Sequence, residues 1–149
     1  MSVWLCLGLI LAAGCRTAEW PAVDCSQPGW RVRHGQAVWK PGAGRPEIAG
    51  ELLLATRDDG AAYVQFAKPP LTLCEARSED ARWWFRAGAT SVRRGRRGPA
   101  PVRLLWLHLD PALRNQPLPS PLRWQTAGAT GWRLENPQRD EWIEGFLGP

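Results

Sequence analysis

The middle of the chain alternates apolar and polar residues with a period of two, which is typical of strands that bury one face. An Asp59-Gly60 step separates the first two such segments and predicts a hairpin, because glycine accepts the positive φ of tight turns. Pro69 and Pro70 interrupt strand pairing between the second and third segments, because proline has no N–H to donate and is confined to strand ends and edges. These features predict an antiparallel meander with strands at 48–57, 62–67, 71–76 and 82–86.

The rest of the chain extends this pattern in both directions. A short strand is expected around Val38 and Trp39, and three more are expected at 122–127, 131–136 and 141–147. Segment 102–110 (VRLLWLHLD) is apolar on both faces, so it is either a buried strand or a short helix, and periodicity does not decide between them. Residues 30–149 are therefore predicted to form a single, mostly β domain.

The N-terminal segment has a different character, since no charged residue occurs before Arg16. The apolar run from Val3 to Ala13 is shorter than the roughly 20 residues that span a bilayer as a helix. It has the length of a secretory h-region, about 7–15 residues. The run ends in LAAGC, which resembles the lipobox of bacterial lipoproteins and places Cys15 at the lipidation position. The alternative is a short buried N-terminal segment.

The lipobox resemblance implies a specific processing and location. Residues 1–14 would be a signal peptide, Cys15 would receive a diacylglycerol and an amide-linked acyl chain, and residues 15–29 would be a tether. Two or more acyl chains anchor stably, since each buried CH₂ contributes about 0.8 kcal/mol. Arg16 stands where inner-membrane lipoproteins carry Asp, so the resemblance implies a lipid-anchored protein on the periplasmic face of the outer membrane.

Cysteine usage adds a second expectation for an exported chain. Of the four cysteines, Cys6 leaves with the signal and Cys15 is lipidated, which leaves Cys25 and Cys74. A disulfide between these two suits an oxidising compartment. The alternative is a pair of free buried thiols.

The net charge of +5 indicates anionic partners, and an export signal argues against nucleic acid. The basic run of Arg93, Arg94, Arg96 and Arg97 is either a solvated loop or a contact for anionic headgroups. Each basic residue near such a surface contributes about 1 kcal/mol.

No arrangement of residues indicates catalysis. His108 and Asp110 could together orient an imidazole, but no nucleophile motif accompanies them. No cluster of Cys, His or carboxylates has zinc-ligand spacing, and no glycine-rich phosphate loop is present. We therefore predict no enzyme, no metal and no cofactor.

A second resemblance concerns the predicted meander. It opens with Gly50-Glu51-Leu52, continues to Phe66-x-Lys68-Pro69 and ends in an aromatic strand at 83–85. This pattern is similar to the lipoprotein-localisation family, which comprises the periplasmic lipoprotein carrier and its outer-membrane receptor, itself a lipoprotein. The resemblance implies a curved antiparallel sheet or open half-barrel with one or two short helices, whose apolar cavity holds acyl chains.

If one face of this sheet lines a hollow, alternate strand residues form the cavity wall. The predicted wall consists of Leu52, Leu54, Val64, Phe66, Leu73, Trp83 and Phe85. The receptor family also inserts an apolar side chain from a protruding loop, whereas the hairpin tip expected here, at 58–60, is polar. The alternative is that the tryptophans, of which only Trp4 lies in the predicted signal peptide, simply fill the core of a small sandwich.

The expected function is therefore a monomeric outer-membrane lipoprotein that binds acyl chains or lipoproteins in a hydrophobic cavity. The alternative is a structural envelope lipoprotein that binds a protein partner through a sheet edge or a Trp-rich surface, with no small ligand.

The first testable prediction concerns processing. Cys15→Ser should leave uncut, unacylated precursor, because the thiol that receives the diacylglycerol is gone. Metabolic labelling with a radioactive fatty acid and intact-mass measurement check this. Normal cleavage of the variant, or a mature protein that starts elsewhere, would contradict the lipobox assignment.

Overall fold

A computed structural model of the chain describes residues 23–88, 91–95 and 98–149. The predicted signal peptide 1–14, Cys15, the tether up to residue 22, and Arg96 and Arg97 lie outside these residues.

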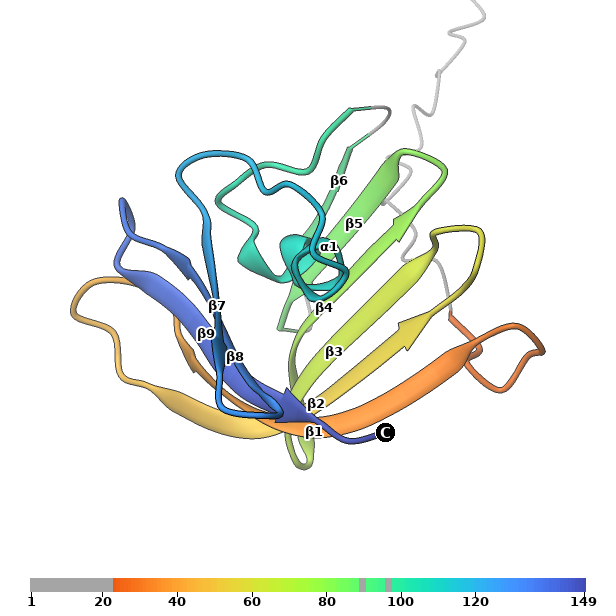
Figure 1. Ribbon diagram of the computed structural model, residues 1–149, viewed down its shortest axis with the longest axis horizontal. Helices are drawn as coiled ribbons and strands as arrows, with labels where there is room; N and C mark the ends of the chain where they lie inside the picture. Colours follow the sequence, from red (N-terminus) through yellow and green to blue (C-terminus); the bar gives the residue numbers. More distant parts are fainter. Residues whose placement is uncertain (1–22, 89–90, 96–97) are drawn as a thin grey trace, which may run out of the picture.

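Nine strands form one antiparallel sheet in the described part of the chain (Figure 1). They are β1 (Arg31–Lys40), β2 (Ile48–Thr56), β3 (Ala62–Lys68), β4 (Leu71–Glu79), β5 (Arg82–Ala87), β6 (Ser91–Gly95), β7 (Arg123–Ala127), β8 (Gly131–Asn136) and β9 (Glu141–Leu147). Their spatial order is β6-β5-β4-β3-β2-β1-β9-β8-β7, so the two end strands do not pair. The predicted mostly β fold with a curved, open antiparallel sheet is confirmed.

Strand β1 joins the two halves of the sheet, because its residues from Gly35 to Trp39 pair with both β2 and β9. The strands coil sharply there, and glycine makes the close approach feasible. A Cβ on Gly145 would lie 2.3 Å from the backbone oxygen of Gln36, and one on Gly50 would lie 2.5 Å from that of Ala67. Residues with side chains would force these strands apart.

A β-bulge lies between β3 and β4, where Phe66 pairs with Cys74 and Ala67 pairs with Thr72. Leu73 is the extra residue, so the strict alternation expected over 71–76 is broken at this point. As a result both Leu73 and Cys74 contact the apolar core. In a regular strand these two adjacent residues would face opposite sides of the sheet.

The ambiguous segment 102–110 is a turn at residues 102–104 and helical from Leu105 onward. A 3-10 turn, η1 (Leu105–His108), runs directly into α1 (Leu109–Leu113), and together they lie on the concave face of the sheet (Figure 1). This segment, Leu105–Leu113, is called the plug below. Most of its residues are apolar and pack inside the curved sheet, and His108 and Asp110 are its polar residues. Pro111 falls in the first turn of α1, where no N–H is needed.

The structure corrects the expected disulfide, since Cys25 and Cys74 are both free thiols. Cys74 shares the concave face with its cross-strand partner Phe66. Cys25 lies on the outer face, near Tyr63 and Arg77. The sheet itself separates the two sulfur atoms, and burial raises the pKa of both thiols.

A thiol count tests this arrangement. A soluble form beginning at Arg16, unfolded without reductant, should titrate two free thiols with a thiol-reactive chromophore. A count of zero would show that the protein forms the bridge and that the sheet is arranged differently around Cys74.

Candidate functional site

All seven residues predicted to line a cavity lie on the concave face and belong to one hydrophobic cluster. Five are buried, and Leu73 and Trp83 are partly exposed at its margins. Register explains the grouping, since Leu52 pairs with Phe66 and Leu54 with Val64 across β2 and β3. The sequence pattern therefore identified the face correctly.

The plug fills most of this face. The ring of Trp106 stacks on Phe66 with centroids 4.9 Å apart and meets Trp39 edge-on at 5.7 Å. The void left beneath the plug, against Val64 and Leu107, measures about 10 Å³. Ligand sites usually offer about 300–1,000 Å³. The concave face is thus covered, and a ligand there has to displace part of the plug.

Two larger openings flank the plug on either side of the void. The first, of about 560 Å³, lies between the β4–β5 turn and segments 98–100 and 116–119, and it is called the turn opening. The second, of about 650 Å³, lies between the plug and the start of β1, and it is called the arginine opening. The void shares Leu107 with the turn opening and Asp110 with the arginine opening, so it lies between them.

Three of the predicted cavity residues reach these spaces. Trp83 lines the turn opening, Val64 the void, and Leu54 the arginine opening. Sequence reasoning missed the arginine opening, because its guanidinium groups come from β1 and from the residue after α1. Only the packing of the plug against β1 brings them together.

Buried polar groups accompany the apolar wall in the C-terminal half of the concave face. Trp39 Nε1 donates a hydrogen bond to Glu141 Oε1 at 3.3 Å, and Asn136 Nδ2 donates to the Val102 carbonyl at 3.2 Å. Within the described residues, no hydrogen bond satisfies Asn136 Oδ1 or the buried indole N–H of Trp106. An unsatisfied buried group costs about 1–3 kcal/mol. This half of the hollow therefore has capacity for a polar atom of a ligand or a water molecule.

His108 does not form the pair with Asp110 that the sequence suggested. Its Nε2 lies 3.2 Å from the carbonyl oxygen of Pro101, while Asp110 accepts a hydrogen bond from Arg114 Nε at 2.9 Å. Burial lowers the pKa of His108, so the neutral ring donates to the carbonyl. In the described part of the chain, no group of His, Cys, Asp and Glu is arranged to hold a metal ion.

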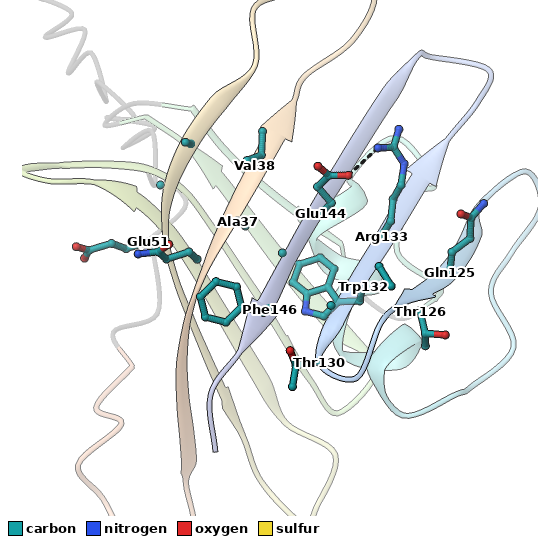
Figure 2. A pocket seen from close by; sticks show the side chains of 16 residues that line it. Ala37, Val38, Glu51, Gln125, Thr126, Thr130, Trp132, Arg133, Glu144 and Phe146 are labelled. Carbon is teal, nitrogen blue, oxygen red and sulfur yellow. Dashed lines mark hydrogen bonds and ion pairs between the residues drawn. The ribbon is translucent and has the colours of Figure 1, made fainter.

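A third space lies on the outer face and was not expected. It is a groove of about 820 Å³ formed by β1, β2, β7, β8 and β9, and it is called the outer groove. Figure 2 shows Phe146 and the Arg133–Glu144 ion pair, with Arg133 Nη1 2.8 Å from Glu144 Oε2, on the same side of the sheet. Phe146 is 46% exposed, so this groove presents an aromatic ring to solvent.

An exposed apolar tip is present, but in a different hairpin from the one expected. Leu71, at the start of β4, is 64% exposed and follows Lys68, Pro69 and Pro70 in the β3–β4 turn. The 58–60 turn is polar, as expected. The alternation pattern could not identify Leu71, because it assigned this residue to a regular strand.

Part of the expected basic loop is a strand. Arg93 and Arg94 lie in β6 and pair with Phe85 and Trp84 of β5. Arg93 is exposed, so headgroup contact remains a prediction for it.

Neither a protein-family model nor a curated protein sequence matches the chain. Among the described residues, no helix has the length and apolar character needed to cross a membrane.

His108 and Glu141, both buried on the concave face, should respond to pH in opposite ways. Burial lowers the pKa of His108 below 6.5, so stability falls as pH drops below that value. Burial raises the pKa of Glu141 above 4.5, so stability falls as pH rises past that value. His108→Gln should remove the first dependence and Glu141→Gln the second, and urea unfolding between about pH 4.5 and 7.5 measures both. The pH dependence of the free energy of unfolding should therefore change in opposite directions in the two variants. A change in the same direction in both would contradict these burial effects.

Proposed function

We propose that this chain is a lipid-anchored outer-membrane protein that binds an acyl chain, free or on a lipoprotein, between its concave sheet and its plug. It performs no chemical step on that chain. The observation that supports this most directly is the position of the plug, which covers an apolar, aromatic-rich face as a separate short segment between two openings.

The plug is connected to the sheet in a way that suits displacement. Pro99 and Pro101 precede it, and Pro117, Pro119 and Pro121 follow it. It donates and accepts no sheet-ladder hydrogen bond, and Trp106 holds it mainly by packing on Phe66. The nine strands therefore retain their pairing when the plug moves.

An acyl chain can offset the loss of the Trp106 contact as long as Leu105, Leu107 and Leu109 stay buried. Removing one large apolar side chain from its buried position costs about 1.5–3 kcal/mol, whereas each buried CH₂ contributes about 0.8 kcal/mol. An acyl chain that takes the position of Trp106 needs roughly four buried methylenes to offset that loss. Chains of ordinary membrane length exceed this number.

The exposed tip is consistent with activity at a membrane surface. A leucine that moves from water into lipid contributes about 1.5–3 kcal/mol. Leu71 is the most exposed large apolar residue in the described part of the chain. The resemblance to the lipoprotein-localisation family implies an apolar side chain that inserts from a protruding loop. The polar 58–60 turn has none, whereas Leu71 is such a side chain.

Ligand binding can be measured with a fluorescent fatty acid, 11-(dansylamino)undecanoic acid, titrated into a soluble form beginning at Arg16. Val64→Trp should weaken binding by about tenfold or more, because it fills the path beneath the plug. Trp106→Leu should strengthen binding, because it leaves room for the chain, and should lower the free energy of unfolding by about 1–3 kcal/mol.

Phe146→Ala is the matched control, since it removes an aromatic side chain from the outer groove and leaves the hollow unchanged. Binding in the hollow predicts that this variant retains the affinity of the wild type. If no probe binds any form, or if only Phe146→Ala loses binding, the hollow is not the site.

A second candidate function rests on the outer groove. Its volume and the exposed Phe146 fit a protein partner that inserts apolar side chains, which corresponds to the structural envelope lipoprotein. Loss of binding in Phe146→Ala alone would favour this candidate.

A further inference from the structure

The two openings beside the plug differ in charge. The arginine opening presents the guanidinium groups of Arg31, Arg33 and Arg114 against one side-chain carboxylate, that of Asp110. The turn opening presents the carboxylates of Glu79 and Asp80 against one guanidinium group, that of Arg82, with His108 neutral. Counted over the described lining residues, guanidinium groups exceed carboxylates at the arginine opening, and carboxylates exceed guanidinium groups at the turn opening. The ion pairs Arg31–Asp58, Arg114–Asp110 and Arg77–Glu79 offset part of this difference, and Arg33 has no carboxylate partner among the described residues.

Arg33 and Arg31 are held in ways that leave them able to bind an anion, whereas Arg114 donates to Asp110 at 2.9 Å. Arg33 donates from Nε to the Gly148 carbonyl at 3.0 Å and from Nη2 to the Leu147 carbonyl at 3.3 Å, and these partners are neutral. Arg31 pairs with Asp58 at 2.6 Å, but both side chains are largely exposed. Exposed ion pairs are worth little and exchange readily.

The floor of the arginine opening is apolar. Leu54 forms it on the sheet side and Leu113 on the plug side, while Val32 pairs with Ala55 and belongs to the other face of the sheet. Leu54 belongs to the concave hydrophobic cluster, and Asp110 borders both this opening and the void beneath the plug. Arg33 and Arg31 thus lie at the rim of an opening with an apolar floor. Asp110, paired with Arg114, separates this opening from the void of about 10 Å³, so an acyl chain that enters here must displace part of the plug.

This combination matches the two ends of an anionic amphiphile. We infer that the arginine opening binds the anionic head group of a single-chain lipid, while its acyl chain runs beneath the plug. The inference rests on the proposed function, because it names the class of ligand that the hollow takes. A fatty-acid carboxylate and a phospholipid phosphate share the required chemistry, since guanidinium groups bind either one in a bidentate manner.

Four amphiphiles with the same twelve-carbon chain test this at concentrations below their micelle thresholds. They are dodecanoate, dodecyl phosphate, neutral dodecyl maltoside and cationic dodecyltrimethylammonium, each titrated by calorimetry into the form beginning at Arg16. At least one anionic ligand should bind about tenfold more tightly than the neutral and cationic ones, with a preference that weakens at high salt. The favoured anion identifies the head-group source.

Arg33→Gln should reduce the affinity for the favoured anion by about tenfold and leave dodecyl maltoside binding unchanged. Arg82→Gln, at the turn opening, is the matched control and should change neither. Circular dichroism confirms that each variant folds. Arg31→Gln changes a second, more exposed arginine of the same opening and should also reduce the affinity for the favoured anion.

The outcomes separate the two proposals. Equal affinity for all four ligands, or a loss that follows Arg82 instead of Arg33 and Arg31, overturns the head-group assignment and leaves acyl-chain binding intact. Failure of every ligand to bind the wild type overturns the proposed function, and the head-group site with it.

Discussion

The packing of Trp106 on Phe66 is the contact on which the rest of the structure depends. A nine-stranded sheet whose end strands do not pair exposes a large apolar concave face, and something must cover it. A single short helical segment does so here, and its largest side chain stacks across the centre of the hollow at 4.9 Å. Apolar area of this kind contributes about 25 cal/mol per Å² when it is removed from water.

A sheet covered by a separate helical segment differs from a closed barrel or a two-sheet sandwich, because its cover can move without breaking strand pairing. In those folds the core is formed by strands that are hydrogen-bonded on both sides, so no part of it leaves without breaking a ladder. In this fold the cover is a separate element bounded by proline-containing segments. The same contact therefore stabilises the domain and decides whether the hollow is accessible.

The buried charges of the outer face belong to the scaffold. Glu75 is buried, and it accepts hydrogen bonds from the Tyr63 hydroxyl and from Arg86 on the neighbouring strands. Each carboxylate oxygen has a partner, which is the condition under which a buried charge is tolerated. This network holds β3, β4 and β5 in register, and it faces away from the hollow.

The sequence by itself determined the strands and the face that they bury. Alternation depends only on the period-two geometry of a strand, so the segments at 131–136 and 141–147 were predicted with the bounds that the structure has. It also placed Leu52, Val64 and Phe66 on one side. Strand β6 was missed, because the arginines at 93 and 94 mask any alternation.

Only the tertiary structure decided what covers that face and what surrounds it. The helical state of residues 105–113 follows from packing inside the curved sheet, which no local pattern reveals. The separation of Cys25 from Cys74 depends on which face the segment before β1 packs against. The three arginines at the plug come from positions 31, 33 and 114, and they converge because the plug crosses the start of β1. Long-range packing of this kind is set by the whole core, so residues distant in sequence meet only after the chain has folded.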